Sequence, residues 1–204
     1  MKRLFLLFIA FLPALCLSAQ MTKNFSIGPR VGVNFAKFTD TDNSESKPGL
    51  VAGLTSTYSI NTNTGITFDA LYSGEGVQSE ADPKIKTDLD YLRLMLAFNY
   101  FFRDQEDNFR PKIYVGPTLG FLLSAENKVE DSESEVDVKD AYKNVDLGLA
   151  VGLGFNYRLG GETWLNVDGR FQPGLSDLRE NKPSNSNAIR NQNFQFSVGL
   201  AFGL

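Results

Sequence analysis

Histidine is absent from this 204-residue sequence, and cysteine occurs only once, as Cys16. Without histidine, the chain lacks the side chain that most often acts as a general base near neutral pH. Cys16 lies in an N-terminal segment that we expect to be removed, so the mature chain would have no thiol nucleophile, disulfide or thiolate metal site. We therefore expect that the protein is not an enzyme and that it has no catalytic residue, cofactor or metal site.

Long apolar runs and basic patches are also missing. Beyond the N-terminal segment, no stretch approaches the roughly 18 uninterrupted apolar residues of a membrane-spanning helix. The formal net charge is −4, and the lysines and arginines do not cluster. An acidic chain without a basic patch argues against nucleic acid as a partner.

The N-terminal segment has the pattern of a secretory signal peptide. Lys2 and Arg3 precede an apolar run from Leu4 to Leu12, and the small residues Ser18 and Ala19 follow. We predict that residues 1–19 are removed and that 20–204 form one domain, whose formal charge is then −6. A lipoprotein acylated at Cys16 is the alternative, but Leu15 stands where such a signal has a small residue.

What the chain does contain is an apolar–polar alternation that returns eight times. In the last segment, large apolar side chains alternate with small or polar ones from Phe194 to Leu204. Since strand side chains alternate between faces, each such segment predicts a strand with one apolar face. Pro29, inside the first segment, predicts a bulge or a poorly paired position. The eight predicted strands are residues 25–38, 49–60, 65–74, 89–102, 112–124, 144–159, 163–173 and 193–203.

The connections between these segments alternate in length. Residues 61–64, 103–110 and 160–162 are the shorter links, whereas 39–48, 75–88, 125–143 and 174–192 are the longer ones. Bacterial membrane barrels have short periplasmic turns and longer extracellular loops. We therefore predict an all-β fold: an eight-stranded antiparallel up-and-down transmembrane β-barrel with periplasmic termini and extracellular long loops.

Four segments carry a family resemblance: YLRLMLAFNYFF, PKIYVGPTLGFLLSAE, VDLGLAVGLGFNYRL and the terminal FQFSVGLAFGL. They resemble the outer-membrane β-barrel (porin-family) proteins and are similar in plan to the small OmpA/OmpX-type barrels. The resemblance implies the outer membrane of a Gram-negative bacterium. The enzymes built on such barrels use histidine, which this chain cannot supply.

Charged residues occur on the strand faces that we expect to point into the barrel. An eight-stranded barrel is just wide enough inside for side chains to fill it, and charges buried there must pair or keep water. We interpret them as a salt-bridged plug; a narrow ion path and a ligand pocket are the alternatives. The predicted interior network consists of Arg30, Asp69, Arg93, Asp146, Arg158, Asp168 and Arg170.

The long connections give weaker indications of a binding site. The third is acidic, with seven carboxylates between Glu126 and Asp140, and Asp40 and Asp42 lie in the first. Carboxylates can hold Ca²⁺, but neither loop has EF-hand spacing, so a solvated loop is the simpler interpretation. The single tryptophan, Trp164, begins the seventh segment, and we expect it at a membrane interface.

Three functional hypotheses follow. The first is a structural or surface-interaction protein of the outer membrane whose interior is plugged by charged side chains. The second is a narrow porin-like channel for ions or small solutes, and the third is a soluble lipocalin-like binder of an apolar ligand. For a membrane barrel we expect a monomer whose partners are outer-membrane lipid, lipopolysaccharide and, through the C-terminal strand, the barrel-assembly machinery.

Overall fold

The computed structural model describes residues 24–39, 44–79, 85–129, 135–180 and 187–204. The predicted signal peptide, residues 1–19, lies outside these ranges. The elements are β1 (Phe25–Phe38), β2 (Ser44–Ser59), β3 (Thr64–Ser79), β4 (Ile85–Phe101), β5 (Phe109–Val129), β6 (Glu135–Asp137), the short 3-10 helix η2 (Lys139–Ala141), β7 (Val145–Gly160), β8 (Thr163–Pro173) and β9 (Asn191–Gly203). No helix in the described part of the chain is both long and apolar enough to cross a membrane.

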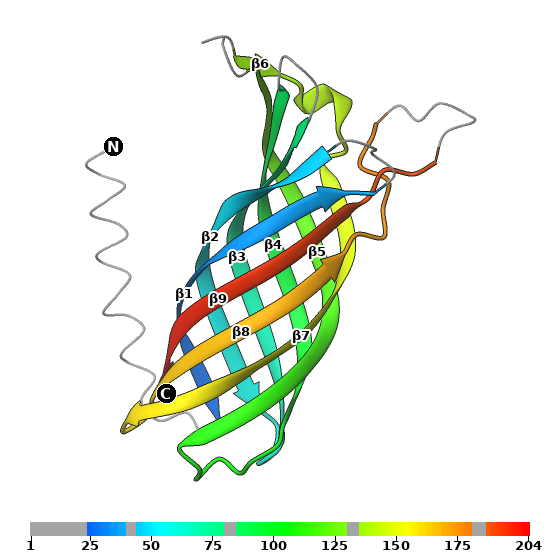
Figure 1. Cartoon of the computed structure of the whole chain (residues 1–204). Helices are drawn as coiled ribbons and strands as arrows, with labels where there is room; N and C mark the ends of the chain where they lie inside the picture. Colours follow the sequence, from blue (N-terminus) through cyan, green and yellow to red (C-terminus); the bar gives the residue numbers. More distant parts are fainter. Residues whose placement is uncertain (1–23, 40–43, 80–84, 130–134, 181–186) are drawn as a thin grey trace, which may run out of the picture.

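Eight of these strands close into an antiparallel barrel. Neighbours follow the order β4-β3-β2-β1-β9-β8-β7-β5, and pairing of β4 with β5 closes the ring. β6 pairs only with the far end of β5, at Glu126–Lys128, and so lies outside the ring. The strands are steeply tilted, and the C-terminus lies at the short-turn end (Figure 1). The predicted eight-stranded architecture is confirmed.

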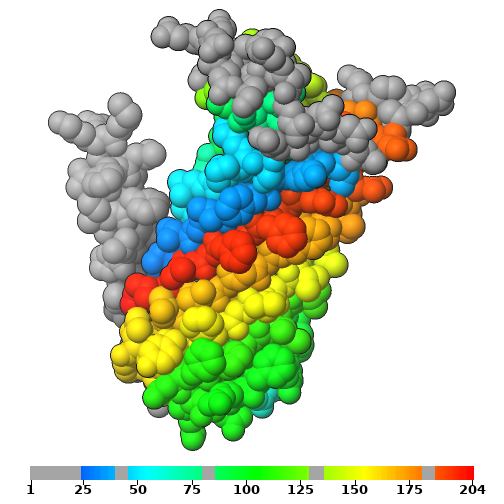
Figure 2. All heavy atoms as spheres, viewed as in Figure 1, coloured from blue at the N-terminus to red at the C-terminus, as the bar shows by residue number. Residues whose placement is uncertain are grey.

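The two faces of the wall differ in chemistry. Large apolar side chains point outward, among them Leu153 at 67% exposure and Leu50 at 60%. Side chains cover the outer wall along the diagonal bands of the strands (Figure 2). The lipocalin-like alternative is therefore wrong, because its apolar residues would have to face inward, and an interior of eight-stranded size could not hold them.

At the short-turn end the strand boundaries lie within one residue of the prediction except for β5, which begins at Phe109 instead of Lys112, and at the long-loop end they differ more. β1 and β8 have the predicted bounds, whereas β2 begins at Ser44, β3 ends at Ser79, β4 begins at Ile85 and β5 ends at Val129. In these extensions the pairing continues between charged residues, for example Lys86 with Lys128 and Asp88 with Glu126. In the extensions the alternation of the membrane wall is reversed, because apolar side chains such as Leu89 and Ala125 point inward and charged ones point outward, so the predicted loops 39–48, 75–88 and 125–143 were too long.

Pro29 is poorly paired rather than bulged. The register of β1 with β9 passes from Ile27–Phe202 to Arg30–Gly199 without a shift, and Gly28 and Pro29 have no β9 partner. The same gap occurs at Gly116 and Pro117 on the β4 side of β5. Proline has no N–H to give to the ladder, which accounts for the missing bonds.

Candidate functional site

Five inward side chains from four strands form the first of two buried ion clusters. The guanidinium of Arg30 lies 3.3 Å from an Asp69 oxygen and 3.0 Å from an Asp168 oxygen. Arg170 Nη1 lies 2.9 Å from the same Asp69 oxygen, and Lys112 Nζ lies 2.9 Å from Asp168. All five side chains are buried. Each carboxylate therefore serves two cations.

The second cluster is centred on Arg93. Its Nε and Nη2 donate to the two oxygens of Glu75, at 2.7 and 2.6 Å, and Nη1 lies 2.7 Å from Asp146. The Arg93 guanidinium also lies 4.5 Å from the centre of the Tyr91 ring. Gly120 lies beside it, and a Cβ there would lie 2.6 Å from Arg93 Nη1, so a larger residue would have to displace the guanidinium.

Six of the seven predicted interior residues lie in these two clusters, and Arg158 does not. Arg158 is only partly buried and lies at the short-turn end, where it donates to the Gln105 carbonyl oxygen at 2.6 Å. Two members of the clusters were missed, Glu75 and Lys112. Glu75 falls in the predicted loop 75–88, although it continues the inward positions of β3. Lys112 precedes the outward Ile113, so alternation alone would have found it.

Neutral side chains extend both clusters. The Thr55 hydroxyl donates to Asp69 at 2.6 Å, and Arg170 Nη2 donates to the Gln195 side-chain oxygen at 2.9 Å. The Ser73 hydroxyl donates to Glu75 at 2.9 Å and accepts a hydrogen bond from Asn34 at 2.7 Å. The eight charged side chains of the two clusters carry four positive and four negative charges. Each ion is therefore compensated, as burial requires.

At the short-turn end, arginines stack on aromatic rings. The Arg110 guanidinium lies 4.1 Å from the centre of the Phe101 ring and donates to the Thr62 carbonyl oxygen at 2.7 Å. The Arg158 guanidinium lies 4.6 Å from the centre of the Trp164 ring. The interfacial placement of Trp164 was wrong: its side chain is 8% exposed and points into the barrel, because its neighbour Leu165 faces outward.

The long-loop end is closed by apolar side chains. Leu178, from the connection between β8 and β9, is 1% exposed and packs in a cluster with Phe38, Leu89, Tyr91 and other buried residues. Both ends of this connection are tied to the Arg93 cluster. Near its start, the Ser176 hydroxyl donates to Asp146 at 2.6 Å; just beyond its end, the Asn191 amide donates to Glu75.

The same connection carries an ion pair of its own. Arg179 Nε lies 3.4 Å from an Asp177 oxygen, and the backbone N–H of Arg179 donates to that oxygen at 3.2 Å. Desolvation would raise the pKa of Asp177, but the hydrogen bonds from Arg179 outweigh it and hold the pKa below its ordinary value.

The candidate calcium loops fall largely outside the described residues. Two acidic residues of the first loop, Asp40 and Asp42, lie outside the described ranges. So do three of the acidic loop: Glu130, Asp131 and Glu133. Of the described acidic residues, Glu126 pairs with Lys128 at 3.3 Å. Within the described ranges, no three acidic, histidine or cysteine residues are grouped so as to hold a metal ion.

Comparisons with known proteins agree with this geometry. Neisserial surface protein A has a similar structure, with a TM-score of 0.58 at 15% identity, covering 88% of this chain and 97% of that one. OprG from Pseudomonas aeruginosa gives 0.54 at 16% identity, covering 89% and 95%. The sequence matches none of the curated proteins with which it was compared. The family model described as outer membrane protein beta-barrel domain matches residues 18–180. The chain therefore belongs to this family of β-barrel proteins of the bacterial outer membrane.

Proposed function

We propose that this chain is a closed, non-conducting and non-enzymatic barrel with a structural or surface-interaction role in the outer membrane. The observation that carries the proposal is the pair of ion clusters in the barrel interior, whose charges balance when the two are taken together. Their eight side chains are buried, and every one lies within 3.3 Å of an oppositely charged partner.

The two mouths support the same conclusion. The stacked arginines fill the short-turn end, and the apolar cluster around Leu178 fills the long-loop end. An ion crossing the barrel would have to displace both layers and break buried ion pairs between them. Breaking one such pair by removing a partner costs about 3–5 kcal/mol.

Single-channel recording from the purified monomer in a planar bilayer tests the proposal. We expect no steady openings. A matched variant, Arg93→Ala, removes the centre of the second cluster and serves to show that the recording would detect a widened path. Steady openings from the unaltered monomer would refute the closed-barrel proposal.

One observation favours the second candidate, a narrow channel. On the inward face of β9, buried side-chain atoms of Asn191, Asn193, Gln195 and Ser197 lack a hydrogen-bond partner among the described residues. Buried polar atoms of this kind are usually satisfied by ordered water, and here they follow one another along a single strand. A hydrated file beside the ion clusters would pass protons or water more readily than solutes. Proton flux into vesicles without single-channel openings would favour this candidate.

We infer the orientation from the connections. Both ends of the barrel, Phe25 and Leu204, lie at the short-turn end, where Leu204 N–H donates to the Phe25 carbonyl oxygen at 2.9 Å. Periplasmic short turns then place the long loops outside the cell. The partners that suit such a monomer are lipopolysaccharide around the wall and the assembly machinery at β9. Protease cleavage within residues 174–190 on intact cells tests the orientation, and protection of that segment would contradict it.

A further inference from the structure

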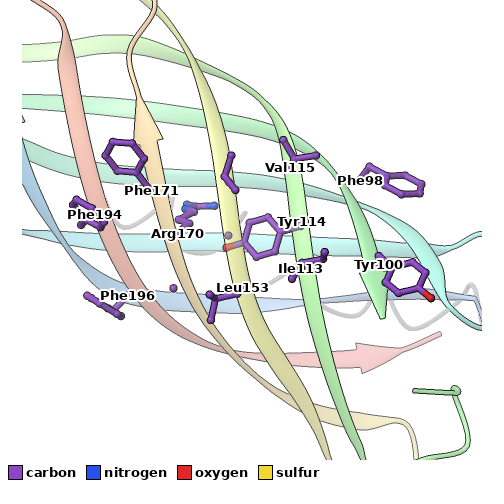
Figure 3. A pocket seen from close by; sticks show the side chains of 13 residues that line it. Phe98, Tyr100, Ile113, Tyr114, Val115, Leu153, Arg170, Phe171, Phe194 and Phe196 are labelled. Atoms are coloured by element: carbon purple, nitrogen blue, oxygen red, sulfur yellow. The ribbon is translucent and has the colours of Figure 1, made fainter. Parts of the chain in front are cut away.

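The outer wall carries one apolar hollow of about 660 Å³. Two cross-strand rows of outward residues line most of it, and the inward residues Tyr114, Gly152 and Arg170 lie between them. The first row runs Phe98, Val115, Val151, Phe171, Phe194, and the second runs Tyr100, Ile113, Leu153, Gly169, Phe196. Both rows begin and end with an aromatic ring, and the residues on β5 and β7 between them, such as Val115 and Val151, are smaller. Figure 3 shows the three phenylalanines of β8 and β9 on one side and Phe98 and Tyr100 on the other.

Gly169 deepens the hollow. It is an outward position on β8 without a side chain, and a Cβ built there would lie 3.5 Å from the Phe196 ring, an ordinary contact. The backbone therefore tolerates a larger residue at this position, and no neighbour requires glycine. The missing side chain leaves space that a partner from the membrane can occupy.

The hollow slants across the wall. Tyr100 is next to the last residue of β4 at the short-turn end, whereas Phe194 is near the start of β9 at the long-loop end. Since a row perpendicular to tilted strands runs obliquely through the membrane, the hollow is long and continuous with the hydrocarbon layer. An extended flexible chain fits this shape.

A polar pair lies at one corner of the hollow, beyond Phe194, whereas Pro173 and Leu149 continue the same level on β8 and β7 with apolar side chains. One outward position beyond Phe35 and Phe194 stand Lys37 and Gln192, which are paired with each other across β1 and β9. Lys37 is exposed. Beyond the hollow at the short-turn end, the next outward positions are apolar or aromatic, such as Phe155 and Phe109, whose ring centres lie 5.2 Å apart. The cation adjoining the hollow therefore selects an anionic head group at the long-loop end.

We propose that this hollow binds an acyl chain of lipopolysaccharide, with a phosphate of its lipid anchor beside Lys37. The proposal rests on the inferred orientation, because long loops outside the cell put Lys37 in the outer leaflet. It gives the wall a preferred lipid position, whereas the rest of the apolar surface would contact lipid without preference.

Photocrosslinking in living cells tests this. Benzoylphenylalanine replaces Phe196, on the rim of the hollow, or Phe68, an outward position on β3 at 44% exposure, as the control site. We expect a lipopolysaccharide adduct at position 196 and much less at 68. Gly169→Leu should reduce the adduct about tenfold, as expected for the loss of about two methylene contacts, and Lys37→Glu should reduce it as well. The matched control Ala70→Leu adds the same side chain to the other wall and should leave it unchanged.

Three outcomes would overturn the proposal: equal adducts at both sites, an adduct indifferent to Gly169→Leu, or an adduct whose mass is that of a phospholipid or a second copy of the chain. The protease assay on the same cells separates this failure from a wrong orientation, which would protect residues 174–190. Each variant is first shown to fold by its heat-dependent shift on an SDS gel.

Discussion

Replacing Asp69 by asparagine should be among the most destabilising isosteric changes in this barrel. Asp69 is fully buried, and one of its oxygens faces both Arg30 and Arg170. Asparagine keeps the shape and the Thr55 contact but removes the charge. Arg30 would retain Asp168 at 3.0 Å, whereas Arg170 would retain only neutral partners among the described residues, the Gln195 amide oxygen at 2.9 Å and the Met95 sulfur at 3.1 Å.

The magnitude follows from the stranded cation. Removing one partner of a buried ion pair leaves an uncompensated charge and costs about 3–5 kcal/mol. We expect Asp69→Asn to lower the free energy of unfolding by that amount. The matched control is Asp88→Asn, because Asp88 pairs with Lys47 where both side chains are about a third exposed. Exposed pairs of this kind contribute about 0–1 kcal/mol.

The assay is urea unfolding of the barrel in lipid vesicles, followed through the fluorescence of Trp164, the single tryptophan. Adding Arg170→Gln to Asp69→Asn removes the stranded cation, so the double variant should be more stable than the sum of the single changes predicts. If Asp69→Asn costs no more than Asp88→Asn, or if the two changes simply add, the ion clusters do not stabilise the barrel as argued here.

Three further predictions concern the wall and the loops. Leu149→Arg, outward on β7, should cost about 2–4 kcal/mol in the same unfolding assay if it lies near the membrane midplane, and an unchanged free energy of unfolding would contradict the assigned facing. Leu178→Asp should withdraw the apolar seal of the long-loop end, so limited proteolysis within residues 174–190 should be faster; an unchanged rate would show that Leu178 does not hold the loop. The pKa of Asp177 lies below its ordinary value of 3.8, so its contact with Arg179 should persist at neutral and mildly acidic pH and be lost only as pH falls through that lowered pKa. Hydrogen exchange of the Arg179 amide measures this contact. Loss of protection already near neutral pH would refute the prediction.

Alternation predicted the barrel because a wall between lipid and a polar interior imposes a period of two on every strand. That constraint holds only within the hydrocarbon layer. β2 to β5 continue beyond it as paired strands, where charged side chains such as Lys86 and Lys128 point outward and Leu89 points inward, so the alternation expected of a membrane wall is reversed there. The ladder of backbone hydrogen bonds persists because it does not depend on which side chains the strand carries.

The same alternation predicted the interior residues, but only within the predicted bounds of each strand. Arg30, Asp69 and Asp168 follow from parity alone. The prediction omitted Glu75 because the predicted strand ends at residue 74. It placed Trp164 at the interface from its residue type, although its position beside the outward Leu165 makes it inward. The pairing of particular ions was beyond the sequence, since it depends on the register of strands that are far apart in the chain.

The position of the Arg93 cluster beneath the apolar cluster around Leu178 suits a role other than passage of ions. The cluster around Arg93 lies directly beneath the apolar seal and binds both ends of the fourth long connection, through Asp146 to Ser176 and through Glu75 to Asn191. Its carboxylates are thus shared between compensating a buried cation and positioning a loop. Passage of ions would not require these hydrogen bonds to the loop, whereas a scaffold that holds a loop in a fixed place depends on them. Under the closed-barrel proposal, the carboxylates of the Arg93 cluster therefore also anchor the loop that the barrel presents.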